Sequence, residues 1–320
     1  MTTARGLSTI LLLGAACLGA SAQPAAPPQS LSLSAIDQIA TNLAKKALES
    51  VDSQGFAPYK ASSGTILAQG DSWFDYPFYD VLQDLEGVYQ WKVQSAAKAG
   101  DTLNNMVYNQ DQLSTFIIRM KRLHEQKEDP KAILISGGGN DVAGQELSLL
   151  LNNARSGLPK LNDAIVTGII DVRLRTSYLT FIKELDVVSE HLLGKRIPIL
   201  IHGYDYAVPD GRGFLGGWGP LPGPWLKPSF DALGYPAPQQ NIETVHLLID
   251  RFNAVLAQIP KEPGYENVCY VKITGTLSST WENGEYQKDW GNELHPTRDG
   301  FKRVAAKFEE SLRNCARIPR

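Results

Sequence analysis

Five short apolar runs, separated by longer segments with helical periodicity, constrain the fold of this chain more than any other feature. The runs lie at 65–69, 90–95, 132–136, 197–202 and 267–273, and the helical patterns lie at 101–126, 160–194, 240–258 and 297–315. Short apolar strands joined through helices are typical of parallel sheets, because each crossover lays its helix over a face of the sheet. The pattern therefore predicts a three-layer α/β/α sandwich with a five-stranded parallel sheet.

The N-terminal residues differ in character from this alternating region. An apolar run at 7–20 follows Arg5 and ends in an Ala-Ser-Ala motif of the kind that signal peptidases cleave. The run is too short for a stable membrane span. A lipoprotein signal at Cys17 is the rival interpretation, but Gly14 stands where such signals prefer leucine. We therefore expect a removable signal at 1–22 and a secreted or periplasmic protein.

Three further segments complete the predicted organisation. Residues 23–30 are rich in proline and predict a mobile linker. Residues 31–61 form an N-terminal extension with a helical apolar pattern, for which Ser32 or Ser34 is the candidate N-cap. Residues 62–320 then form the main domain.

Composition excludes several classes of function. The 320 residues are 43% hydrophobic, enough for one large core or two modest ones, and the formal net charge of -3 gives no field that would favour nucleic acid. No P-loop, dinucleotide-binding glycine pattern or metal-ligand spacing occurs, so we expect neither a cofactor nor a metal. After signal removal Cys269 and Cys315 remain, and a disulfide and two buried free thiols are equally compatible with the sequence. The oligomeric state stays open.

Chemically reactive side chains follow some of the apolar runs directly. Ser72 follows the run at 65–69, Asn140 follows the run at 132–136, and His295 precedes the last helical pattern. In open parallel sheets the active site lies at the carboxyl ends of the strands. A serine nucleophile, a donor for the oxyanion and a histidine base are the groups that acyl-ester hydrolysis requires.

Four sequence blocks resemble those of the SGNH/GDSL hydrolase superfamily and occur in the order of that superfamily. The blocks are Gly70-Asp71-Ser72-Trp73, with tryptophan in place of leucine, Ala99-Gly100-Asp101-Thr102-Leu103, Gly138-Gly139-Asn140-Asp141 and His295-Pro296-Thr297. The resemblance covers residues 62–316. It implies a flavodoxin-like SGNH hydrolase fold and serine esterase chemistry through an acyl-enzyme.

The resemblance also implies a role for each block. Ser72 would be the nucleophile, His295 the base, and the oxyanion hole would consist of the backbone N–H groups of Ser72 and Gly100 and the side-chain amide of Asn140. Each residue also has a plainer interpretation: Ser72 could cap a helix beginning near Phe74, and Gly100 and Asn140 could be turn residues. Because the four blocks occur together, we favour the catalytic roles.

The residue that would orient the histidine departs from the superfamily pattern. Three positions before His295, where an acid is usual, the chain has Asn292. An amide cannot offset an imidazolium as a carboxylate does, and it can favour the wrong tautomer. We favour a Ser–His dyad assisted by Asn292. Substitution by Asp289 or Glu293, and a catalytically slow site, are the alternatives.

Several residues near the blocks are candidates for substrate contact. These candidates are Trp73, Asp75, Tyr204 and Trp218. The last two belong to an insertion at 204–240 that is rich in aromatic residues, glycine and proline. A loop of this length is often functional, and it could line a substrate groove, form a lid or simply pack onto the domain. We expect Asp71 to fix the turn at the serine, and His202 to be buried with its hydrogen bonds satisfied.

The sequence thus predicts an exported serine hydrolase that cleaves carboxylic esters. Acetyl or short acyl esters of carbohydrates are one substrate class, because aromatic residues in the insertion could stack on sugars. Lipid or aryl esters are nearly as well supported. The alternative of another class, motivated by Asn292, is a non-catalytic binding protein on the same scaffold. We expect a small-molecule or polymeric ester as substrate, no nucleic-acid partner and no stable membrane span.

Overall fold

A computed structural model describes most of the chain. The described residues are 29–52, 64–217 and 220–318. The expected signal at 1–22, most of the linker at 23–30 and Trp218 lie outside these residues. Among the residues that are described, no helix has the length and apolar character needed to cross a membrane.

The sheet has five strands, and every strand pair is parallel. The strands are β1 (Thr65–Gly70), β2 (Lys92–Ser95), β3 (Ala132–Ser136), β4 (Ile199–His202) and β5 (Val268–Val271), in the order β2-β1-β3-β4-β5. All residues of β1 and β3 are buried, as expected for central strands covered on both faces. The predicted parallel sheet is confirmed.

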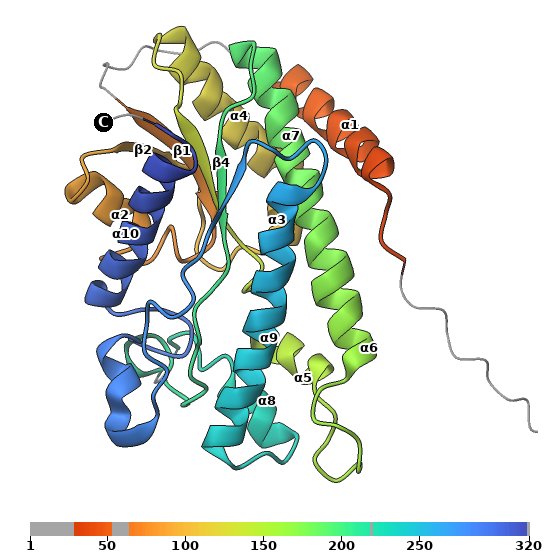
Figure 1. Ribbon diagram of the computed structural model, residues 1–320, viewed down its shortest axis with the longest axis vertical. Helices are drawn as coiled ribbons and strands as arrows, with labels where there is room; N and C mark the ends of the chain where they lie inside the picture. The colour runs from red at the N-terminus through yellow and green to blue at the C-terminus, as the bar shows by residue number, and fades with distance from the viewer. Residues whose placement is uncertain (1–28, 53–63, 218–219, 319–320) are drawn as a thin grey trace, which may run out of the picture.

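Helices cover both faces of this sheet (Figure 1). The helices of the layers are α1 (Leu33–Asp52), α2 (Val81–Gly87), α3 (Leu103–Tyr108), α4 (Gln110–Glu125), α7 (Arg175–Leu193), α9 (Pro238–Gln258) and α10 (Arg298–Asn314). The connections between β3, β4 and β5 also contain α5 (Leu147–Leu150), α6 (Asp163–Val166), η2 (Thr167–Leu174) and α8 (Lys227–Ala232). Helices α2 and α10 cover one face, and α3, α4, α7 and α9 cover the other. Helix α1 packs outside α4 and α7, so the predicted three-layer sandwich is confirmed with an additional outer helix.

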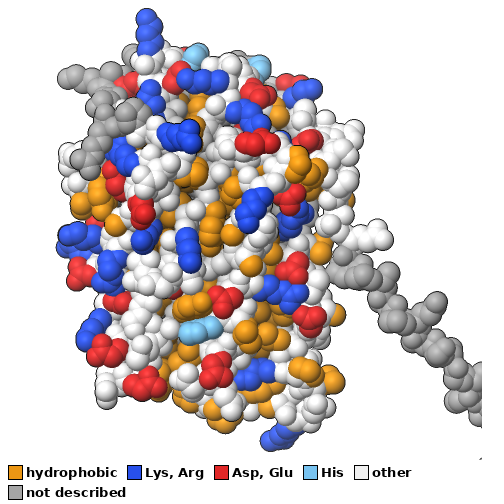
Figure 2. Space-filling view, viewed as in Figure 1, with side chains coloured by type: hydrophobic (Ala, Val, Ile, Leu, Met, Phe, Trp, Pro, Cys, Tyr) orange, Lys and Arg blue, Asp and Glu red, His pale blue; other side chains and the backbone are white. Residues whose placement is uncertain are grey.

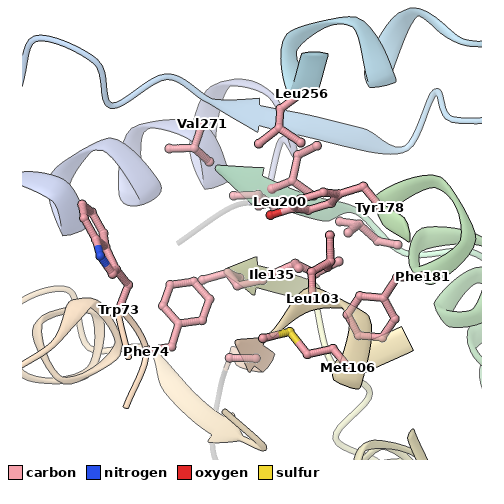
Figure 3. Close-up of a cluster of buried hydrophobic side chains, with 14 of the residues drawn as sticks. Trp73, Phe74, Leu103, Met106, Ile135, Tyr178, Phe181, Leu200, Leu256 and Val271 are labelled. Atoms are coloured by element: carbon pink, nitrogen blue, oxygen red, sulfur yellow. The ribbon is translucent and has the colours of Figure 1, made fainter. Parts of the chain in front are cut away.

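The core holds the sheet and its flanking helices together (Figure 3). Ile135 of β3 lies between Trp73 and Phe74 on one side and Tyr178 and Phe181 of α7 on the other. On the face shown in Figure 2, acidic and basic side chains are interspersed rather than gathered by sign. The dominant stabilising contribution is therefore apolar burial in the layers rather than surface charge.

The segment after β1 differs from the prediction. The helix expected near Phe74 is absent from this part of the described chain, which turns repeatedly and has a positive φ of 76° at Phe78. Helix α2 begins only at Val81, where the side chain of Asp80 accepts a hydrogen bond from the backbone N–H of Gln83 at 2.8 Å. The N-cap role considered for Ser72 therefore belongs to Asp80.

Two predicted helical segments are interrupted. The segment at 101–126 divides at Asn109, whose side chain caps α4 by accepting from the backbone N–H of Asp111. The segment at 160–194 contains the eight-residue π-helix η2 between α6 and α7. π-Helical segments are rare in proteins, and those that occur are often found at functional sites.

A disulfide joins Cys269 of β5 to Cys315, which follows α10. The two cysteines are 46 residues apart in sequence. The alternative that the sequence left open is thus decided in favour of the disulfide. The bond fixes the C-terminal end of α10 to the edge of the sheet.

Candidate active site

Ser72 and His295 lie in hydrogen-bonding contact although 223 residues separate them in sequence. Ser72 follows β1, and His295 lies in the loop before α10, whose N-cap is Thr297. The distance between Ser72 Oγ and His295 Nε2 is 2.7 Å. The indole N–H of Trp73 donates to the carbonyl of Leu294 at 3.1 Å and ties the two segments together. This is the geometry that a nucleophile and its base require.

Asn292 determines which nitrogen of His295 carries the proton. Its Oδ1 accepts from the backbone N–H groups of Leu294 and His295 at 3.0 and 2.9 Å, and lies 3.0 Å from His295 Nδ1. Because backbone N–H groups only donate, this atom must be the amide oxygen. Nδ1 therefore donates, and Nε2 is left to accept the Ser72 proton. The amide group supports the tautomer that catalysis needs.

Two other residues proposed for the orienting role are held elsewhere. The carboxylate of Asp289 accepts from the backbone N–H of Ser278 at 2.6 Å and pairs with Arg303. Glu293 binds backbone groups of the insertion. The structure therefore brings Asn292 to His295, and does not bring Asp289 or Glu293 there.

Burial determines the basicity of His295. The residue is only 5% exposed, the ring of Tyr76 stacks on the imidazole with centroids 4.4 Å apart, and the phenol accepts from the Asn292 amide at 3.0 Å. Desolvation lowers the pKa of His295 to about 3, since burial penalises the charged form. The imidazole is therefore neutral in mildly acidic solution, but it is a weak base.

Substituting Asn292→Asp tests this assignment through the pH dependence. A carboxylate beside Nδ1 stabilises the imidazolium, so it raises the pKa of His295 and moves the acidic limb of kcat/KM to higher pH. Wild-type protein should keep its activity further into acid, since His295 loses base function only near its low pKa. At neutral pH the variant should be about tenfold faster, because a charge-assisted hydrogen bond strengthens as the imidazolium forms. An acidic limb that does not move would contradict the role of Asn292.

The expected oxyanion donors come from three neighbouring segments. Among the described residues, no group accepts from the backbone N–H of Ser72 or of Gly100. Gly100 adopts a φ of 80°, which favours glycine. The Asn140 amide donates to the carbonyl of Asp101 at 2.8 Å, which places Asn140 beside the Gly100 turn with one amide hydrogen remaining. Asp75, a predicted substrate contact, accepts from the backbone N–H of Ala99 at 2.9 Å and braces the same turn.

A buried hydrogen-bond network anchors the serine block. Asp71 accepts from the backbone N–H of Trp73 at 2.9 Å, from the Ser136 hydroxyl at 2.7 Å and from the Tyr204 hydroxyl at 2.5 Å. The Tyr204 hydroxyl in turn accepts from the backbone N–H of Gly139 at 3.1 Å. Tyr204 thus links the Ser72 and Asn140 blocks in addition to lining the pocket. The expected role of Asp71 at this turn agrees with these bonds, whereas the part of Ser136 was not predicted.

His202 is buried, as the sequence analysis expected, but only one of its ring nitrogens is bonded. Nδ1 contacts the carbonyl of Gly203, whereas Nε2 has no partner among the described residues. Burial lowers the pKa of His202 to about 4, so the ring is neutral and packs against Trp73 and Phe74. His202 therefore contributes to the core beneath the serine block.

Glu293 attaches the insertion to the histidine loop. The side chain is fully buried and accepts four backbone hydrogen bonds, from Gly211 and Lys227 at 2.9 Å, from Leu226 at 2.6 Å and from Trp225 at 2.5 Å. Desolvation raises the pKa of Glu293, and these four donors oppose that rise. The anchor positions Trp225, whose ring lies edge-on to His295 at 5.5 Å. This anchoring role of Glu293 was not predicted from the sequence, in which Glu293 was an alternative partner of the histidine.

Replacing Glu293 by glutamine should weaken this anchor. Each carboxylate oxygen accepts two backbone N–H groups, so the new NH2 group would face two donors in either orientation. We expect the free energy of unfolding to fall by about 2–4 kcal/mol, the cost of buried donors left unpaired. Urea denaturation measures the loss, and the exposed Glu282→Gln is the matched control. Equal stability of the two variants would show that Glu293 anchors nothing.

An apolar pocket opens at the serine. It has a volume of about 100 Å³, and Ser72, His295, Asn140, Trp73 and Tyr204 lie at its polar end. Buried aliphatic and aromatic side chains of α5, η2, α9 and the insertion form the remaining walls. Two predicted substrate contacts, Trp73 and Tyr204, therefore line the pocket. In the described part of the chain, no cluster of three or more His, Cys, Asp or Glu residues could hold a metal ion.

The chain was compared with known protein families, curated proteins and solved structures, and only solved structures are similar to it. A scan against protein-family models and a search of curated proteins gave no match. Among solved structures, a candidate SGNH hydrolase from Slackia heliotrinireducens is 12% identical with a TM-score of 0.41, covering 78% of this chain and 100% of its own. An acetylxylan esterase from Geobacillus stearothermophilus, a catalytic mutant, is 14% identical with a TM-score of 0.42, covering 82% of this chain and 99% of its own. The first bears the superfamily name that the four blocks suggested, but likeness of this degree decides neither family nor activity.

Proposed function

We propose that the chain is an exported serine hydrolase that cleaves carboxylic esters through an acyl-enzyme. The observation that carries the proposal is the hydrogen bond between Ser72 Oγ and His295 Nε2, in a ring whose tautomer Asn292 fixes. The disulfide between Cys269 and Cys315 supports export, since such bonds persist mainly in oxidising compartments.

The proposed reaction has two balanced halves. In the first, the Ser72 proton passes to His295 Nε2 as Oγ bonds to the ester carbon, and the same proton then passes to the alcohol oxygen as its bond to carbon breaks. In the second, a water molecule gives its proton to Nε2 and attacks the acyl carbon. The proton returns to Oγ as the acid is released.

In both halves, the hydrogen-bond donors around Ser72 would stabilise the negative charge that develops on the carbonyl oxygen of the substrate. The negative oxygen would accept from the backbone N–H groups of Ser72 and Gly100 and from the amide of Asn140. Preorganised donors of this kind supply a large share of catalysis, because they need no reorientation as charge develops. The braces from Asp75 and Asp101 hold two of these donors in place before substrate arrives.

Labelling with a fluorophosphonate tests the proposal against the binding-protein alternative. The reagent forms a covalent adduct only with an activated serine. We expect one adduct per chain, located by peptide mass spectrometry on Ser72, and none in heat-denatured protein. A folded protein that remains unlabelled, or an adduct on another serine, would overturn the proposal and favour the non-catalytic scaffold.

A further inference from the structure

The pocket at Ser72 extends away from the reactive groups along α9. Phe252 adjoins the loop that carries Asn140, because a Cβ on Gly138 would lie 2.7 Å from its ring. Val245 lies two turns earlier on the same helix, a distance of about 10 Å along the axis. Both residues line the pocket and are at most 6% exposed. The pocket therefore runs from the oxyanion donors toward the N-terminal part of α9.

The opposite walls of this extension are equally apolar. They come from α5 through Leu147 and Leu150, and from the π-helix η2 through Ile170 and Leu174, all at most 2% exposed. Arg251 of α9 binds Asp171 and Asp163 and the Thr167 hydroxyl, so it fastens η2 and α6 to α9 from outside the pocket. The walls are thus held in place, although a cavity lies between them.

The two carboxylates that line this pocket, those of Asp71 and Asp205, are already engaged. The oxygens of Asp71 accept from Trp73, Ser136 and Tyr204, and those of Asp205 accept from three backbone N–H groups. A sugar hydroxyl entering the extension would exchange its bonds to water for apolar contacts, which is unfavourable. An alkyl chain gives up no hydrogen bonds there and gains from leaving water. The geometry thus favours an apolar guest over a carbohydrate.

We infer that this extension is the acyl site, and that the substrates are esters of medium-length apolar carboxylic acids. The inference rests on the proposed function for its covalent step. The acyl group occupies the site in both halves of the reaction, whereas the alcohol must leave and water must enter. A pocket with apolar walls suits the acyl part of the ester, which remains bound. The acetyl group of a carbohydrate ester would leave most of the extension empty.

A series of p-nitrophenyl esters from acetate to decanoate tests the inference. We expect kcat/KM to rise about fourfold for each methylene that enters the extension, and then to level off. Val245→Phe fills the far end and should lower the ratio of octanoate to butanoate kcat/KM about tenfold or more. Leu247→Phe is the matched control, since Leu247 lies on the same helix but is 60% exposed, and it should leave the ratio unchanged. A flat profile or a maximum at acetate would overturn the inference.

A binding measurement separates failure of the inference from failure of the proposed function. Calorimetric titration of Ser72→Ala with decanoate needs no turnover, and we expect saturable binding at one site that acetate does not compete for. Binding in a protein whose wild type hydrolyses no ester would overturn the proposed function and leave the apolar-acid site standing. Ester hydrolysis without decanoate binding would do the reverse.

Discussion

Replacing Ser72 by alanine is expected to abolish ester hydrolysis while leaving the fold intact. The substitution removes only the hydroxyl that lies 2.7 Å from His295 Nε2, and no structural hydrogen bond other than this one depends on it. Loss of a serine nucleophile lowers kcat by about a millionfold in a comparable serine hydrolase. The test is to measure kcat/KM of Ser72→Ala and of wild-type protein for p-nitrophenyl butanoate at neutral pH.

A second serine provides the control for this experiment. Ser156 lies exposed on the loop between α5 and α6, and Ser156→Ala should retain wild-type kcat/KM. Thermal melting of both variants verifies the fold. Residual activity in Ser72→Ala within tenfold of wild type would mean that another group is the nucleophile.

Removing the disulfide between Cys269 and Cys315 is expected to lower the free energy of unfolding substantially. In the loop-entropy account a bond that closes 46 residues stabilises the folded state by about 4 kcal/mol. The double variant Cys269→Ala, Cys315→Ala should therefore melt about 5–10 °C lower than wild type. Helix α10, which ends one residue before Cys315, packs on α2 and β5, so its anchoring affects one face of the sheet.

Activity distinguishes a stability effect from an effect on the site. His295 precedes the N-terminus of α10, at the other end of the helix from Cys315. The double variant should accordingly keep wild-type kcat/KM at temperatures where it is folded, and wild-type protein treated with a reductant should melt at the lower temperature. An unchanged melting temperature would contradict the account, and so would loss of activity in the folded variant.

The strands and most long helices could be predicted because their apolar residues recur with a clear period. The runs before Ser72 and Asn140 are β1 and β3, and their register pairs Gly70 with Ser136, which brings the two blocks to the same edge of the sheet. The prediction of a helix beginning near Phe74 was wrong. The chain there contains Pro77 and Phe78, whose φ is positive, and local turn geometry outweighed helical propensity.

Long-range contacts were the part that sequence could not supply. The four bonds of Glu293 join backbone groups of an insertion far away in the chain, and backbone donors have no sequence signature. The disulfide depends on a distance that only the fold sets. The apolar extension of the pocket arises from α5, η2 and α9 together, and each contributes residues that a helical pattern predicts simply as core.

The acyl-enzyme is the central claim, and trapping it is the most direct test. Wild-type protein mixed rapidly with excess p-nitrophenyl octanoate and quenched in acid should carry one octanoyl group per chain by intact-mass measurement. Peptide mapping should locate this group on Ser72, and Asn292→Asp, whose base is stronger, should still form the same adduct. Rapid turnover with no adduct at any quench time, or an octanoyl group on another residue, would contradict the mechanism.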